Sequence, residues 1–142
     1  MSLPTPGPDR AAVVTGASSG IGAEMARELH RRGHQVVLVA RSADKLEALA
    51  AEFGERAYVL PADLSDRPTR ADLLRRVEAL GLTPDVLINN AGLSTLGPVA
   101  ASDPDAEMNM VEVDVVAVAD LCSRFLPGMV ERGQGAVLNV AS

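Results

Sequence analysis

Aromatic residues, cysteine and histidine are all scarce in this 142-residue chain. With 2% aromatic residues, the core has to be built from Val, Leu, Ile and Ala, and no set of rings is available to stack on nucleic-acid bases. The lone Cys122 excludes an internal disulfide and a cysteine metal site, which favours a reducing, cytoplasmic location. His30 and His34 fall at a predicted helix end and turn, so we expect solvated side chains and no metal site.

The charge balance and the lengths of the apolar runs argue against two further classes of protein. A net charge of -6 disfavours a nucleic-acid partner, because such proteins neutralise phosphates with clustered Lys and Arg. No apolar run reaches the ~18 residues of a membrane span. Residues 1–9 are rich in Pro and Gly and do not resemble a signal peptide, so we expect a flexible leader followed by one domain over residues 10–142.

Short apolar runs alternate with longer amphipathic stretches along the chain. The expected strands are residues 11–15, 35–40, 57–60, 86–89 and 136–141. The expected helices are one from about residue 21 that Gly33 stops, then 43–52, 69–80 and 107–131. This alternation predicts an α/β fold, a Rossmann-like doubly wound parallel sheet with strand order 3-2-1-4-5. Such sheets bind ligands where the strand order reverses, beside the first strand.

Helical spacing of apolar residues predicts which helix faces are buried. The first helix is expected to bury Ile21, Met25, Ala26 and Leu29, and the third Leu73, Leu74, Val77 and Leu80. The long helix is expected to bury one stripe of residues, which are Val111, Val115, Val118, Cys122, Phe125 and Met129. Ser42 is placed to cap the second helix.

Three glycines separate the first strand from the first helix, in the sequence Thr15-Gly16-Ala17-Ser18-Ser19-Gly20-Ile21-Gly22. Glycine permits a tight turn and a close approach of backbone to ligand. A pyrophosphate can then sit on the helix N-terminus, where free N–H groups and the helix dipole favour an anion. The same pattern also occurs in glycine-rich turns that bind no ligand, so its position after a strand and before a helix is what favours a binding site.

The spacing T-G-x-x-x-G-I-G resembles the cofactor loop of the short-chain dehydrogenase/reductase family. Three more landmarks follow in the family's order: Asp63-Leu64 after the third strand, Asn89-Asn90-Ala91-Gly92 after the fourth, and Leu126-Pro127-Gly128-Met129 followed by residues 137–142. Each has a structural alternative, since Asp63 could cap a turn, the asparagines could form one, and Pro127 could kink a helix. Together they cover nearly the whole chain.

The resemblance implies an oxidoreductase that transfers hydride between a nicotinamide dinucleotide and a carbonyl or alcohol. It places Asp63 and Leu64 beside the adenine, and Asn90, Ala91 and Gly92 in the cofactor site. Ser142 matches the serine that binds the substrate oxygen, although it could simply end a strand. Asp114 stands where the family has an asparagine, and it could either keep that geometry or be a tolerated polar residue.

The end of the second strand indicates which dinucleotide is preferred. Enzymes that prefer NAD carry Asp or Glu there, whereas this chain has Ala40 followed by Arg41 and Ser42. A guanidinium can bind a 2′-phosphate through two hydrogen bonds. We therefore predict NADP(H) over NAD(H), with Ser18, Ser19 and Ser42 as neighbouring donors. The alternative for Arg41 is a solvated residue before a helix.

The family's Tyr-x-x-x-Lys motif is absent from the 142 residues. The only tyrosine, Tyr58, lies at the third strand, and the only lysine, Lys45, lies in the second helix, so neither can replace it. We therefore expect the 142 residues to be inactive alone, and to be part of a longer enzyme or completed by another polypeptide. The alternatives are a non-catalytic dinucleotide-binding module and an assembly subunit. The resemblance also implies a homodimer or homotetramer formed through helix 107–131.

The loop 94–103 is expected to form one rim of the substrate pocket. Leu96 and Val99 in this loop, together with Leu93 just before it, suggest a partly apolar carbonyl or alcohol substrate.

Overall fold

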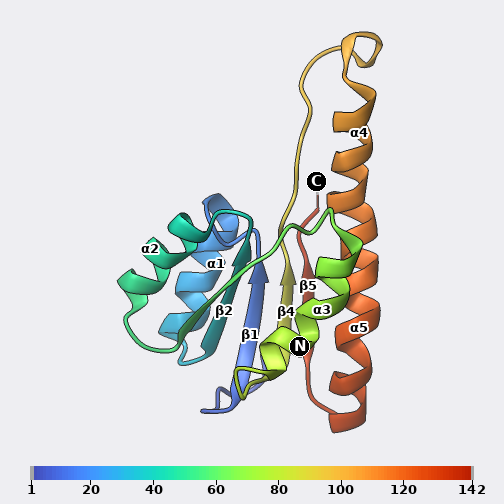
Figure 1. Cartoon of the computed structure of the whole chain (residues 1–142). Coiled ribbons are helices and arrows are strands. Elements are labelled where there is room, and N and C mark those ends of the chain that lie inside the picture. Colours follow the sequence, from blue (N-terminus) through green and yellow to red (C-terminus); the bar gives the residue numbers. More distant parts are fainter. Residues whose placement is uncertain (1, 142) are drawn as a thin grey trace.

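In the computed structural model, which describes residues 2–141, five parallel strands form one sheet (Figure 1). The strands are β1 Arg10–Thr15, β2 Gln35–Ala40, β3 Ala57–Pro61, β4 Thr83–Asn89 and β5 Ala136–Asn139. Their order is β3-β2-β1-β4-β5, and all four pairings are parallel. The predicted fold class and strand order are therefore confirmed.

Helices cover both faces of the sheet (Figure 1). They are α1 Gly20–Arg31, α2 Ala43–Phe53, α3 Arg67–Glu78, the short η1 Val99–Ala101, α4 Pro104–Val111, the π-helical η2 Glu112–Val116 and α5 Ala117–Arg132. Alternate residues of β1 enter two cores: Val13 packs with α3 and α5, and Val14 packs with α1 and α2. A central strand covered on both sides has to be apolar throughout, which explains its uninterrupted apolar run.

Two residues predicted to be buried lie on the surface instead. Ile21 in the first turn of α1 is 60% exposed, and Leu80 is 38% exposed. Leu80 follows the end of α3 at Glu78, where the chain turns towards Gly81 with a φ of 77°, so it does not continue the buried face of that helix. The other predicted residues of these two helices are buried or half-buried.

The long helix buries a different stripe from the one predicted. Its buried residues are Val113, Ala117, Leu121, Phe125 and Met129. Val111 and Val115 are 39% and 60% exposed, and Val118 and Cys122 are only half-buried. The buried residues of α5 lie four residues apart, which places Val118 and Cys122 beside the stripe rather than on it. The π-helical turn η2 holds an extra residue relative to an α-helical turn, so it rotates the face before it, where Val111 lies, relative to the faces of α5. The prediction was correct for Phe125 and Met129 only.

Element ends differ from the predictions by a few residues. The third helix begins at Arg67 rather than at residue 69, because Asp66 caps it by accepting a hydrogen bond from the backbone N–H of Thr69 at 2.9 Å. The long helix begins at Pro104, and β5 ends at Asn139. Ser42 occupies the N-cap position of α2 as predicted, although its side chain makes no capping hydrogen bond.

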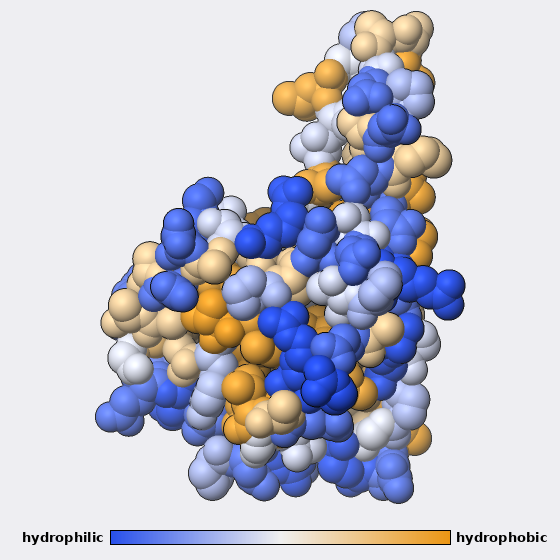
Figure 2. Space-filling view, in the orientation of Figure 1, coloured by the Kyte–Doolittle hydropathy of each residue, from blue (hydrophilic) through white to orange (hydrophobic). Residues whose placement is uncertain are grey.

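The helical arm formed by α4 and the loop before it projects beyond the sheet (Figure 1). Apolar side chains on this arm and along the long helix are exposed, as the orange surface in Figure 2 shows. The most exposed of them are Leu96, Val99, Met108, Val115 and Val130. None of the helices among residues 2–141 has the length and apolar character needed to cross a membrane.

His34 is buried, contrary to the prediction of a solvated side chain. It is 3% exposed in the turn between α1 and β2, and its backbone N–H bonds the carbonyl of Leu29 at 3.1 Å. Burial lowers the pKa of His34 below its ordinary value of 6.5, and the positive charge of Arg32 acts in the same direction. The carboxylate of Asp85 opposes this shift without reversing it.

The lowered pKa of His34 predicts a loss of stability in mild acid. As the pH falls below 6.5, His34 takes up a proton in the unfolded chain but stays neutral in the folded chain. The free energy of unfolding should therefore decrease between pH 6.5 and the lower pKa of His34 in the folded state. Urea denaturation of the wild type and of His34→Gln between pH 5 and pH 7.5 measures this, and the variant should show the flatter profile. His30→Gln, which keeps His34, is the control. Equal slopes for wild type and His34→Gln would contradict the assignment.

Candidate dinucleotide site

A cleft of about 680 Å³ opens at the carboxyl ends of the strands, where the strand order reverses between β1 and β4. Segments that follow β1, β2, β3 and β4 all contribute to its walls. The lining residues are Gly16, Ser18, Ser19, Ala40, Arg41, Ser42, Lys45, Ala62, Asp63, Leu64, Asn90, Ala91, Gly92, Leu93 and Val113. The fold thus brings together ten of the residues predicted from sequence for a cofactor site. The exceptions are Gly20, Ile21 and Gly22, which lie in the same turn and helix start but outside this lining.

Thr15 and Asn90 join the glycine turn to the end of β4. The Thr15 hydroxyl accepts hydrogen bonds from the backbone N–H groups of Asn90 and Ala91, each at 3.0 Å. The Asn90 amide donates to the carbonyls of Thr15 at 3.2 Å and Gly16 at 3.3 Å. Asn90 therefore holds one wall of the cleft against the other. Thr15 stands in the quoted motif but was not predicted as a site residue, because its hydrogen bonds depend on the pairing of β1 with β4.

The three glycines have different structural requirements. Gly16 has a φ of 66°, and a Cβ there would lie 2.8 Å from the Ala91 Cα. Gly22 has an ordinary helical φ, yet a Cβ would run into the Gly16 carbonyl and the Asn90 amide. Gly20 has a φ of 55°, and a Cβ on it would meet nothing within 4 Å. The glycines at 16 and 22 thus allow close packing, while space remains open beside Gly20.

The N-terminus of α1 is suited to an anion. Its first turn contains no acidic residue, and Ser19 at the N-cap makes no capping hydrogen bond through its side chain. The N–H groups of this turn carry the positive end of the helix dipole. Open space at Gly20, free N–H groups and two serine hydroxyls fit a pyrophosphate at this position.

Two cations lie at the far end of the cleft, beyond β2. Arg41 and Lys45 are exposed and both line the cleft, whereas Ala40 supplies no carboxylate. Within residues 2–141 neither cation is held in an ion pair, so both charges are available to a ligand. The sequence reading missed Lys45 as a site residue. The spacing of four residues between Arg41 and Lys45, across the start of α2, was the signal that could have found it.

Asp63 shapes the wall that follows β3. Its Oδ1 accepts hydrogen bonds from the backbone N–H of Ser65 at 2.9 Å and from the Ser65 hydroxyl at 2.7 Å. Asp63 therefore forms a turn and lines the cleft at the same time, so the two readings of this residue are compatible. Leu64 beside it is 5% exposed and also belongs to the core.

Asp114 lies in the π-helical turn η2 beside the cleft. Its Oδ1 accepts a hydrogen bond from the backbone N–H of Leu93 at 2.8 Å, and Leu93 directly follows Gly92. A carboxylate supplies this acceptor as well as an amide would. Asp114 thus ties the helix to the loop after β4, while Val113 and Leu93 form the nearby lining. Ser142, the other predicted catalytic residue, lies outside the described residues.

Cys122 contacts polar groups rather than the core for which it was predicted. The Asn89 amide donates to the Asn139 side chain at 2.9 Å and approaches the Cys122 sulfur at 3.4 Å. This cluster lies where β4 and β5 end. Among residues 2–141 no group of three or more His, Cys, Asp or Glu side chains is placed to hold a metal ion.

The fold and the cleft together define an α/β domain of the Rossmann-like class. Residues 10–142 match the profile of the family described as short chain dehydrogenase. The chain belongs to the short-chain dehydrogenase family.

Relatives and solved structures agree with this assignment. The chain is 37% identical to very-long-chain 3-oxoacyl-CoA reductase of Macaca fascicularis, over 96% of this chain and 46% of that protein. It is 41% identical to nodulation protein G of Rhizobium sp. (strain N33), over 94% of this chain and 54% of that protein. The chain thus spans about half the length of these curated relatives.

Two similar solved structures contain a nicotinamide dinucleotide. A metagenomic short-chain oxidoreductase in complex with NADP has a TM-score of 0.88 and 36% identity, over 94% of this chain and 62% of that one. A short-chain dehydrogenase from Sphingobium yanoikuyae in complex with NADPH has a TM-score of 0.85 and 35% identity, over 94% of this chain and 53% of that one.

Proposed function

We propose that the chain binds NADP(H) in the cleft and forms the cofactor-holding part of an oxidoreductase that acts on a carbonyl or alcohol substrate. The observation that carries this proposal is the glycine turn, which faces Asn90 across the point where the strand order reverses. The relatives that hold NADP and NADPH support the choice of ligand. When bound, the nicotinamide supplies or accepts the hydride.

In this proposal, three groups of cleft residues each bind a different part of the dinucleotide. The turn Gly16–Gly22 and the N-terminus of α1 hold the pyrophosphate, and Asp63 and Leu64 bind the adenine. Asn90, Ala91 and Gly92 form the wall towards the nicotinamide. Asp114 maintains the loop after Gly92, and Ser142 binds the substrate oxygen, as the family resemblance implies.

The same proposal extends to activity, assembly and location. We expect the 142 residues alone to bind NADP(H) without turnover, because they contain no Tyr-x-x-x-Lys motif. The exposed apolar residues of the long helix favour assembly as a homodimer or homotetramer. A cytoplasmic location and a partly apolar substrate remain predictions. A non-catalytic dinucleotide-binding module is the second candidate, and assays of carbonyl compounds with a longer product of the same gene would separate the two.

We predict that Arg41→Ala weakens NADPH binding by about ten- to a hundred-fold, because a hydrogen-bonded charge pair contributes about 1.5–3 kcal/mol. NADH binding should change by less than about two-fold, since NADH carries no 2′-phosphate. Dissociation constants of NADPH and NADH, measured by calorimetry, test whether the protein binds a nicotinamide dinucleotide and which of the two it prefers. Arg31→Ala is the control, because it removes the same charge from the C-terminal end of α1, outside the cleft lining. Tighter binding of NADH than of NADPH by the wild type would refute the preference, and binding of neither would refute the function.

A further inference from the structure

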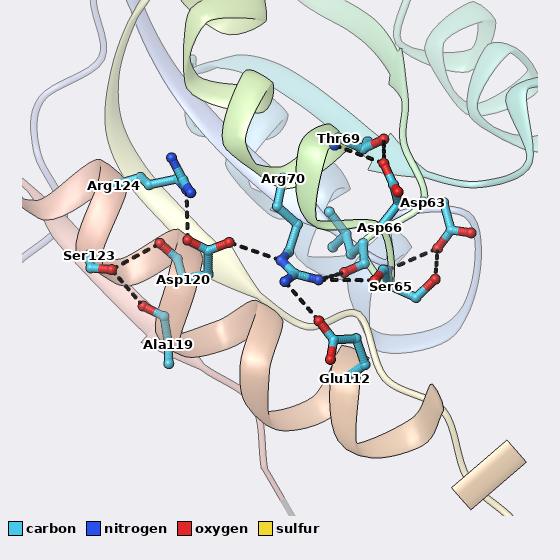
Figure 3. Close-up of polar contacts among 11 residues, drawn as sticks. Asp63, Ser65, Asp66, Thr69, Arg70, Glu112, Ala119, Asp120, Ser123 and Arg124 are labelled. Carbon is cyan, nitrogen blue, oxygen red and sulfur yellow. Dashed lines mark hydrogen bonds and ion pairs between the residues drawn. The ribbon is translucent and has the colours of Figure 1, made fainter. Parts of the chain in front are cut away.

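Arg70 on α3 is a charged side chain enclosed within the protein. Its side chain is 2% exposed, yet every part of the guanidinium has a partner (Figure 3). Nη1 donates to the carbonyls of Leu64 at 2.7 Å and Ser65 at 3.2 Å. Nη2 pairs with Glu112 at 2.8 Å, and Nε pairs with Asp120 at 3.0 Å.

The charges around Arg70 compensate for its burial. Burial by itself lowers the pKa of Arg70, but the hydrogen bonds that Arg70 donates to Asp120 and Glu112 outweigh that effect, and the pKa rises above its ordinary value. Burial similarly acts to raise the pKa of Asp120, whereas Arg70 and Arg124 lower it overall. Arg124 pairs with the second oxygen of Asp120 at 2.7 Å. Arg70 and Asp120 therefore both stay charged, and several hydrogen bonds and ion pairs fix the orientation of each side chain.

The position of Arg70 relative to the cleft suggests more than a role in stability. Asp63 and Leu64 line the cleft, whereas Arg70 lies behind them and does not. Two of its four hydrogen bonds go to the backbone of this wall, and Ser65 in turn bonds the Asp63 carboxylate. The other two bonds go to the long helix, at Glu112 and Asp120. The wall after β3 is thus attached to a rigid helix through one side chain.

We infer that Arg70 is a positioning residue that holds the Asp63–Leu64 wall at the spacing required by the adenine half of the dinucleotide. This assignment rests on the proposed function. It predicts that loss of Arg70 weakens binding of the adenine half much more than binding of the nicotinamide half. A residue needed only for folding would weaken both halves alike.

The test compares Arg70→Met with Arg132→Met. Arg132 pairs with the buried Asp85 at 3.3 Å and does not line the cleft, so its loss removes an arginine that pairs with a buried carboxylate elsewhere. The probes are adenosine 2′,5′-bisphosphate, titrated by calorimetry, and nicotinamide mononucleotide, titrated by NMR. For Arg70→Met we expect about ten-fold weaker binding of the bisphosphate, equivalent to one unit in log Kd, and less than two-fold change for the mononucleotide. Arg132→Met should change neither.

A milder variant and a ligand-free measurement keep the test informative if Arg70→Met folds poorly. Glu112→Ala removes one of the two carboxylates that pair with Arg70, and the Glu112 side chain is 35% exposed, so its loss should disturb folding less. The affinity for the bisphosphate should fall by about three-fold. Hydrogen exchange without ligand should be faster at residues 63–66 in both variants than in Arg132→Met. Unchanged bisphosphate binding, or equal losses for both probes, would overturn the assignment. Failure of the wild type to bind either probe would refute the proposed function itself.

Discussion

Gly22→Ala is expected to lower the free energy of unfolding by about 3 kcal/mol, the upper range for overpacking a rigid site, and to weaken NADPH binding by at least about a hundred-fold. Helix propensity favours alanine over glycine by about 1 kcal/mol at a position with ordinary helical φ, so propensity alone predicts the opposite sign. Sterics decide the outcome because the new Cβ would run into the Gly16 carbonyl and the Asn90 amide.

Neither of these neighbours can move cheaply. The Gly16 carbonyl is backbone, and the Asn90 amide already donates to two carbonyls at 3.2 and 3.3 Å. Relief of the clash would push α1 away from the turn and separate Asn90 from Gly16, which disrupts both walls of the cleft. Loss of stability and loss of binding should therefore occur together.

Gly128→Ala is the matched control for Gly22→Ala. Gly128 also lies within a helix, α5, but a Cβ there would clash only with Nη1 at the end of the Arg132 side chain, at 2.8 Å, and not with backbone. We expect a change within about 1 kcal/mol and unaltered NADPH binding. Urea denaturation and NADPH fluorescence measure both quantities for both variants. A Gly22→Ala protein as stable as the wild type, or one that binds NADPH normally, would contradict the assigned packing.

The architecture could be predicted from sequence because its signals are local. Each strand is a continuous apolar run bounded by turn residues, and right-handed crossovers leave few possible strand orders. The glycine turn and Asn90 follow their strands directly, and Asp63 lies two residues after the end of β3. Since all strands are parallel, these segments meet at one edge of the sheet whatever the details of the helices.

The predictions that failed depend on contacts between segments distant in sequence, or on an irregular backbone. The buried stripe of the long helix was misplaced at its start because a π-helical turn is not visible in apolar spacing. Within α5, Val118 and Cys122 adjoin the buried Ala117 and Leu121, and apolar spacing does not distinguish these neighbours. His34 is polar and adjoins a glycine, so nothing local indicated that the fold would bury it. Arg70 resembled any solvated helical arginine, because its partners Glu112 and Asp120 are 42 and 50 residues away in the sequence.

Asp85 is buried at the opposite end of the sheet from the cleft, and its removal is expected to have the other large effect. It is 2% exposed and lies at an irregularity in β4, where Ala11 pairs with Pro84 and Ala12 with Val86. The additional residue turns its side chain towards donors from three segments. Arg10 donates at 2.6 Å, Gln134 at 2.9 Å and Arg132 at 3.3 Å.

Asp85→Ala should therefore lower the free energy of unfolding by about 3 kcal/mol, because breaking a buried ion pair leaves uncompensated charge and unpaired donors. For a domain of this size that corresponds to a fall in Tm of about 10 °C. NADPH affinity should change by less than about two-fold, since the cleft lies at the other end of the strands. Calorimetry of the free protein and NADPH titration measure the two quantities.

Asp72→Ala is the control for Asp85→Ala. Asp72 pairs with Arg75 at 2.5 Å, but the Asp72 and Arg75 side chains are 42% and 70% exposed, and such surface pairs contribute little to stability. Its Tm should stay within about 1 °C of the wild type. If the two substitutions lowered the Tm equally, the burial of Asp85 and its three donors would contribute no more to stability than a surface ion pair does. A Tm fall confined to Asp85→Ala, with NADPH affinity retained, would show that the two ends of the sheet serve separate purposes: Asp85 joins β1, β4 and the start of β5, whereas the carboxyl ends of the strands hold the ligand.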